Sequence, residues 1–274
     1  MASLRTSLIA LYVLIALVAA HAGVTEVVNV PSKAMKRSFR ATFVFPDSYK
    51  ASGKRYPVVY VLHGWSGNYA IWPRVAPLAE YADKYQVLFV CPDGNTNSWY
   101  LNSPAAPASK FETYIVTEVV GFVDTTCRTI ADAKGRALMG SSMGGHGALT
   151  LIARNPGLFC AAAGISGIMD LTEFPREWDI ARVLGDYERN RVVWEASSFV
   201  NMIPTLVRTN CRISLDCGTE DFALNGNRKA HALLTQAGIE HDYSERPGGH
   251  MAEYVHRNAE FSVLFLVRAM VVVR

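Results

Sequence analysis

A serine lies between two glycines in the segment Gly140-Ser141-Ser142-Met143-Gly144. The apolar residues 137–139 before it have the pattern of a short strand, and residues 145–154 carry apolar side chains at helical spacing. A serine on so tight a strand-to-helix turn is strained, and residues larger than glycine two positions before or after it would collide there. The free N–H groups of the following helix face the same place and stabilise negative charge. We therefore predict that Ser142 is a nucleophile, the alternative being a strand-to-helix connection without chemistry.

A serine hydroxyl attacks an ester only when a base takes its proton, and a histidine held by a carboxylate is the usual base. Of the histidines that follow Ser142, we favour His250, because it comes after Pro247-Gly248-Gly249, a flexible loop behind the last expected strand. Such a loop can place a histidine over the serine. The other candidates are His146, His231, His241 and His256.

Three carboxylates surround the end of the expected strand 213–217: Asp216, Glu220 and Asp221. In α/β-hydrolase folds the chain order is nucleophile, acid and then histidine, so the acid is expected in this region. Asp216 lies inside the strand, whereas Glu220 and Asp221 lie in the turn beyond it. Spacing alone does not separate Glu220 from Asp221, and turn capping is the alternative role for either.

The oxyanion of an ester intermediate needs two converging N–H donors. The residue after the nucleophile, Met143, is expected to supply one, and the loop after the first buried strand supplies the other. In His63-Gly64-Trp65 we assign this second donor to the backbone of Trp65, because Gly64 permits a close approach. Ser166 also ends an expected strand but lacks the motif, and we interpret it as structural.

The chain alternates strand and helix patterns, which predicts βαβ units and a mostly parallel sheet flanked by helices, hence an α/β fold. Residues 95–110 are expected to form a long loop, and residues 166–208 an insertion over the sheet edge. Expected strands are 38–45, 56–62, 87–90, 137–139, 160–165, 213–217 and 241–245; expected helices are 75–85, 112–130, 145–154, 225–236 and one from 252.

Residues 1–22 have the pattern of a secretory signal peptide, with Arg5, an apolar run and a small-residue site that predicts cleavage after Ala22. We expect a secreted or periplasmic protein whose single domain is 23–274, the alternative being an uncleaved anchor. Residues 261–273 are apolar but too short to span a bilayer, so no stable membrane span is expected after cleavage.

The composition excludes some functions. Half of the residues are hydrophobic, 19% are charged and the net charge is only +3 with no basic stripe, so nucleic acid is not an expected partner. The five cysteines leave at least one unpaired within the chain. No His/Cys cluster has metal-ligand spacing, and we expect no metal and no cofactor.

Five stretches of the chain, in one order, resemble the esterase D group of the α/β-hydrolases: RYPVVYVLHGWSGN, DGNTNSWYLNSP, RALMGSSMGGHGALTLIARNPGLF, CGTEDF and RPGGHMAEY. The group includes feruloyl, acetyl-xylan and tributyrin esterases, S-formylglutathione hydrolases and mycolyl transferases. The resemblance implies the α/β-hydrolase fold, with Ser142 as nucleophile, Asp221 as acid and His250 as base. It also implies that the backbones of Met143 and Trp65 bind the oxyanion.

The resemblance implies a secreted serine esterase that hydrolyses short-chain acyl esters, or acyl or feruloyl esters linked to a carbohydrate, through an acyl-enzyme on Ser142. An acyltransferase of the mycolyl-transferase type is the alternative, and a binding protein without catalysis is another. Trp99 and Tyr100 in the loop 95–110 are candidates for walls of the substrate pocket, packing of the loop being their other role. The sequence leaves the oligomeric state open.

Overall fold

The computed structural model describes residues 23–270, and the predicted signal peptide lies outside the described residues. Eight strands are present: β1 (Val24–Ser32), β2 (Arg37–Phe45), β3 (Val58–Leu62), β4 (Leu88–Pro92), β5 (Arg136–Ser141), β6 (Ala161–Ile165), β7 (Arg212–Gly218) and β8 (His241–Arg246). The larger helices are α3 (Leu78–Tyr85), α5 (Val120–Thr126), α6 (Met143–Arg154), α8 (Arg191–Ser197), α9 (Phe199–Leu206), α10 (Leu224–Gln236) and α11 (Ala252–Ala269). Shorter helical segments are α1 (Ser48–Ala51), α2 (Trp72–Val75), α4 (Phe111–Thr113), η1 (Tyr114–Val119), η2 (Ala133–Gly135), η3 (Leu171–Glu173) and α7 (Ile180–Leu184).

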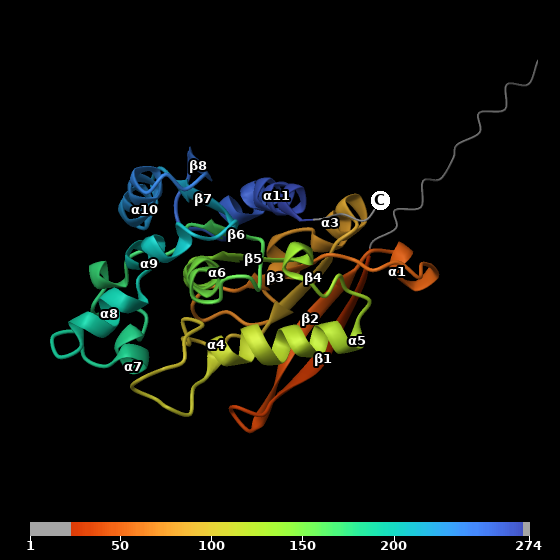
Figure 1. Ribbon diagram of the computed structural model, residues 1–274, viewed down its shortest axis with the longest axis horizontal. Coiled ribbons are helices and arrows are strands. Elements are labelled where there is room, and N and C mark those ends of the chain that lie inside the picture. Colours follow the sequence, from red (N-terminus) through yellow and green to blue (C-terminus); the bar gives the residue numbers. More distant parts are fainter. Residues whose placement is uncertain (1–22, 271–274) are drawn as a thin grey trace, which may run out of the picture.

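All eight strands form one sheet in the order β1-β2-β4-β3-β5-β6-β7-β8 (Figure 1). The strands from β4 to β8 run parallel to one another, whereas β1 and β2 pair antiparallel at one edge. This is the mostly parallel sheet that the alternation of patterns predicted. Since parallel strands end at the same edge of a sheet, the loops after β3, β5, β6, β7 and β8 meet there.

The central strands are buried on both faces, which explains why their sequences lack alternation. Along β3, Val58, Tyr60 and Leu62 pack on one side with α5, α6, α9 and α10. Val59 and Val61 pack on the other side with α2, α3 and α11. The sheet therefore lies between two layers of helices, as Figure 1 shows for α11 and α3 on one side and α5 on the other. Within residues 23–270, no helix has the length and apolar character needed to cross a membrane.

The structure corrects several expected element boundaries. Strand β1 was not expected, because most of its residues face solvent or are only half-buried at the edge of the sheet. The expected helix 75–85 begins only at Leu78, after Pro77, as α3, and Val75 is the last residue of a separate short helix, α2. The helix expected over 112–130 ends at Thr126 and includes a wider turn, η1. The insertion 166–208 contains η3, α7, α8 and α9, and α9 packs against α6 and α10 instead of covering an edge strand.

The turn between β5 and α6 has no room for a side chain two positions before or after Ser142. A Cβ atom on Gly140 would lie 2.2 Å from the carbonyl oxygen of Gly144, and one on Gly144 would lie 2.1 Å from the carbonyl oxygen of Leu62. We expect Gly144→Ala to lower the free energy of unfolding by at least about 2 kcal/mol, because the backbone of β3 must move. Urea unfolding followed by circular dichroism measures this change.

Gly121 on the exposed side of α5 provides the matched control, since a Cβ atom there meets nothing within 4 Å. Gly121→Ala should raise the free energy of unfolding by up to about 1 kcal/mol through helix propensity alone. Equal effects of the two substitutions would contradict the close approach at Gly144.

Candidate active site

The loops after four strands, β3, β5, β7 and β8, bring the predicted catalytic and oxyanion residues together. Ser142 follows β5, and its backbone has φ 56° and ψ −120°, a region that residues other than glycine rarely occupy. This is the strained turn that the motif predicted. Because Ser142 directly precedes α6, the free N–H groups of the helix start beside its hydroxyl.

His250 lies within hydrogen-bond distance of both predicted partners. Its Nε2 is 2.8 Å from Ser142 Oγ, and its Nδ1 is 2.9 and 3.0 Å from the two carboxylate oxygens of Asp221. A carboxylate only accepts hydrogen bonds, so His250 Nδ1–H donates to Asp221 and Nε2 is left to accept from the Ser142 hydroxyl. The three residues thus form a continuous chain of hydrogen bonds from β7 through the loop after β8 to β5.

The structure distinguishes the three candidate carboxylates. Asp221 is buried and also accepts a hydrogen bond from the Ala223 N–H at 2.8 Å. Burial raises the pKa of Asp221, but the hydrogen bond and charge of His250 outweigh it and hold that pKa below its usual value. Glu220 points into solvent. Asp216 accepts a hydrogen bond from Tyr254 and pairs with Arg246, away from His250.

The two backbone N–H groups predicted to bind the oxyanion belong to Met143 and Trp65, in the segments that follow β5 and β3. Met143 is the first residue of α6, and Trp65 lies in the turn after β3. Within residues 23–270, neither N–H has a hydrogen-bond acceptor. A Cβ atom on Gly64 would lie 3.4 Å from the Cβ of Ser142, so the β3 loop passes directly beside the serine. This arrangement has the two free donors that an oxyanion requires.

A cavity of about 390 Å³ opens over Ser142 and His250. Its lining includes the loop from Gly64 to Gly67, residues of α2, and two aromatic residues that the sequence analysis did not single out, Trp178 and Phe222. Ser166, interpreted as structural, also lines the cavity. The position of Phe222 directly after Asp221 was the one feature of the sequence that could have placed it at the site, whereas no feature of the sequence placed Trp178 there.

Trp99 and Tyr100 do not line this cavity, which corrects the expectation that they form its walls. Both are fully buried and have positive φ angles of 53° and 57°. Tyr100 donates a hydrogen bond to the His63 carbonyl at 3.0 Å, and Trp99 Nε1 donates to the Trp178 carbonyl at 3.4 Å. Both residues therefore pack the long loop, which is the other role that the sequence left open. Trp99 contacts Trp178, which lines the cavity, but does not line the cavity itself.

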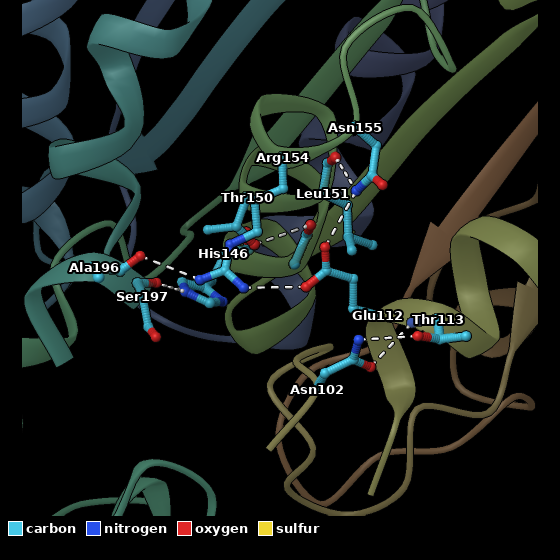
Figure 2. A network of polar contacts seen from close by, with 11 residues as sticks. Asn102, Glu112, Thr113, His146, Thr150, Leu151, Arg154, Asn155, Ala196 and Ser197 are labelled. Carbon is cyan, nitrogen blue, oxygen red and sulfur yellow. Dashed lines mark hydrogen bonds and ion pairs between the residues drawn. The ribbon is translucent and has the colours of Figure 1, made fainter. Parts of the chain in front are cut away.

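His146, a rival candidate for the base, points away from Ser142. Figure 2 shows it on α6 beside Ser197, whose carbonyl oxygen lies 2.9 Å from His146 Nε2. The same view shows Glu112 accepting hydrogen bonds from Arg154 at 3.0 Å and from Asn155 at 3.4 Å. His146 thus joins the first turn of α6 to the end of α8, and Glu112 joins the last turn of α6 to α4, so the helix that carries the elbow is fixed at both ends.

Burial lowers the pKa of His146 to about 4, against about 6.5 in the unfolded chain. The unfolded chain therefore takes up a proton near pH 6.5, while the folded protein keeps this ring neutral until about pH 4. The contribution to stability is complete above pH 6.5 and is lost as the pH falls toward 4, by roughly 3 kcal/mol at most. We expect His146→Gln, whose amide still donates to Ser197, to have a flatter dependence of unfolding free energy on pH over this range.

Urea unfolding at pH 7, 6, 5 and 4 measures the effect. Parallel curves for the wild type and His146→Gln would show that His146 does not carry this pH dependence.

Across the described part of the chain, no group of three or more His, Cys, Asp or Glu side chains is placed to hold a metal ion. The five cysteines are free thiols, and Cys91 and Cys217 are buried.

Residues 32–262 match the family model described as "Putative esterase". The chain belongs to this family. An esterase of Mycobacterium tuberculosis (strain ATCC 25618 / H37Rv) is 30% identical over 242 residues, which cover 76% of this chain and 51% of that protein. The chain therefore spans about half the length of this curated relative. The diacylglycerol acyltransferase/mycolyltransferase Ag85A of Mycobacterium bovis (strain BCG / Pasteur 1173P2) is 25% identical over 222 residues, covering 74% of this chain and 63% of the relative.

Among solved structures, a ferulic acid esterase is similar to this chain with a TM-score of 0.79 and 25% sequence identity. The match covers 91% of this chain and all of that one. The fold is therefore that of the α/β-hydrolase esterases, as the sequence predicted.

Proposed function

We propose that this member of the esterase family hydrolyses carboxylic esters through an acyl-enzyme on Ser142. The observation that carries the proposal is the hydrogen-bonded chain from Asp221 through His250 to Ser142 Oγ. The family match supports the same reaction class. Because all three side chains are present and in contact, the site favours catalysis over the binding-only alternative.

The reaction follows from the geometry. His250 Nε2 takes the proton of Ser142 as Oγ attacks the ester carbonyl, and the N–H groups of Met143 and Trp65 stabilise the resulting oxyanion. Asp221 keeps His250 in the required tautomer and stabilises its charged form. His250 then gives the proton to the departing alcohol. Water activated by the same histidine releases the acid in the second half of the cycle.

The lining of the cavity indicates an uncharged substrate. Of the described residues that form it, His250 is the one with an ionisable side chain, and no lysine or arginine is among them. A thioester of glutathione would bring carboxylates into a cavity that has no cation to pair with them. Acetyl or other acyl esters of neutral alcohols are therefore the substrate class that we propose.

An ester panel tests the proposal. It combines p-nitrophenyl esters of increasing acyl length with methyl ferulate, acetylated xylan and S-formylglutathione. We expect hydrolysis of one or more neutral esters and at least tenfold lower kcat/KM for the glutathione thioester. Preference for the thioester would contradict the assignment of an uncharged substrate.

Acyl transfer to an alcohol is the second candidate, and the similarity to a relative named as an acyltransferase/mycolyltransferase favours it. Both reactions share the acyl-enzyme and differ in whether water or an alcohol attacks it. Chromatographic product analysis with glycerol or trehalose added to the ester distinguishes them, since transfer produces a new ester and hydrolysis only the acid.

We also propose export of the protein, from the pattern of residues 1–22. N-terminal sequencing of the protein expressed in a secreting host tests it. A mature chain that begins at Gly23 is the expected result.

A further inference from the structure

One wall of the cavity consists of aromatic rings from two distant parts of the chain. Phe222, from the loop after β7, packs against the ring of His250 with centroids 4.2 Å apart and planes 31° apart. Trp178, from the insertion after β6, stacks on Phe222 at 5.3 Å and 28°. We call Trp178 and Phe222 the aromatic wall. Phe222 is 47% exposed and lines the cavity, so its ring is accessible to a ligand there.

The segment that carries Trp178 is held in a strained conformation. Trp178 and Asp179 have φ angles of 49° and 55°, two successive left-handed residues that are not glycine. Trp99 from behind and Phe174 from the side pack on Trp178, with centroid distances of 6.3 and 4.9 Å. Strain of this kind persists only where the surroundings enforce it, and it concentrates at ligand-binding sites.

The reaction requires the alcohol to leave close to His250. In acylation the bond from Ser142 Oγ to the carbonyl carbon forms and the bond from that carbon to the alcohol oxygen breaks. The proton taken from Ser142 passes from His250 Nε2 to this oxygen. The alcohol must therefore depart within reach of His250, and the ring that covers His250 is Phe222.

We propose that the aromatic wall binds the alcohol part of the substrate and selects an uncharged alcohol that carries a ring. Flat rings pack on aromatic side chains with a gain beyond simple burial. Among the described residues, no lysine, arginine, aspartate or glutamate lines the cavity to bind an ionic group. A sugar ring and an aromatic alcohol share this chemistry. The inference rests on the proposed esterase activity and assigns the leaving-group side of its site.

The test compares esters that share one acyl group. We would measure kcat/KM for methyl acetate, benzyl acetate and a monoacetylated xylose, with the wild type and with Trp178→Leu, Trp178→Phe and Phe222→Leu. All of these substrates form the same acetyl-enzyme, so differences in kcat/KM report the step in which the alcohol leaves. Trp178→Phe keeps a ring in the wall and is the matched control for Trp178→Leu.

We expect the wild type to prefer at least one ring-bearing acetate over methyl acetate. Trp178→Leu should reduce that preference about tenfold, and Trp178→Phe should retain most of it. The substrate for which the preference falls identifies the alcohol: benzyl acetate would indicate an aromatic alcohol, and monoacetylated xylose a sugar. The ratio of kcat/KM for methyl ferulate to that for methyl acetate should stay constant in Trp178→Leu, because these two esters differ only in the acyl part.

An unchanged preference for ring-bearing acetates in Trp178→Leu and Phe222→Leu would overturn the inference. A change only in the ratio of kcat/KM for methyl ferulate to that for methyl acetate would also overturn it, because the wall would then bind the acyl group. Thermal unfolding checks that each variant is folded. If the wild type hydrolyses no ester in a manner that depends on Ser142, the proposed function itself has failed, which is a different result from an unchanged preference.

Discussion

Ser142→Ala should lower the rate of ester hydrolysis by about 10⁴-fold or more, because no other hydroxyl within residues 23–270 has the same contact with His250. The residual rate would come from the oxyanion donors and substrate binding alone. Steady-state kinetics on p-nitrophenyl acetate measures the loss. The melting temperature should change little, since the substitution removes one oxygen from the mouth of a cavity.

A fluorophosphonate probe provides an independent measurement, because it forms a covalent bond with an activated serine. Mass spectrometry should place the label on Ser142 in the wild type. Ser141→Ala should still be labelled and Ser142→Ala should not, which separates these adjacent serines. Hydrolysis by folded Ser142→Ala at close to the wild-type rate would contradict the acyl-enzyme mechanism.

Asp221→Asn should lower kcat by about 10³- to 10⁴-fold. An amide in this position can donate a hydrogen bond to His250 Nδ1, so the histidine then carries its proton on Nε2 and cannot accept the proton of Ser142. The charge that stabilises the protonated histidine is also lost. Burial of Asp221 and its two contacts with His250 make this the second largest effect that we expect.

Glu220→Gln is the matched control, because it replaces the adjacent carboxylate with an amide, as Asp221→Asn does. Glu220 faces solvent, so kcat should change by less than about twofold. The reverse result, a large loss in Glu220→Gln and a small one in Asp221→Asn, would assign the acid to Glu220. Comparing both variants at several pH values also shows whether the loss is a general one or follows the titration of the base.

The sequence determined the features that depend on local geometry. Gly140 and Gly144 around Ser142 predicted the strained turn, because a tight turn restricts side-chain size within five residues. Apolar runs without alternation predicted strands buried on both faces. The loop of Pro247-Gly248-Gly249 singled out His250, since a histidine that must reach across the sheet needs a flexible connection.

Tertiary structure decided what depends on residues far apart in the chain. The choice between Glu220 and Asp221 needed the direction in which each side chain points from one turn. Trp99 and Tyr100 have the residue types of pocket walls, yet the packing of their loop buries them behind the site. Trp178 reaches the cavity only because the insertion folds on α6 and α10, and no local pattern encodes that contact. Local spacing therefore specified the proposed nucleophile, whereas the shape of the cavity beside it arises from long-range packing.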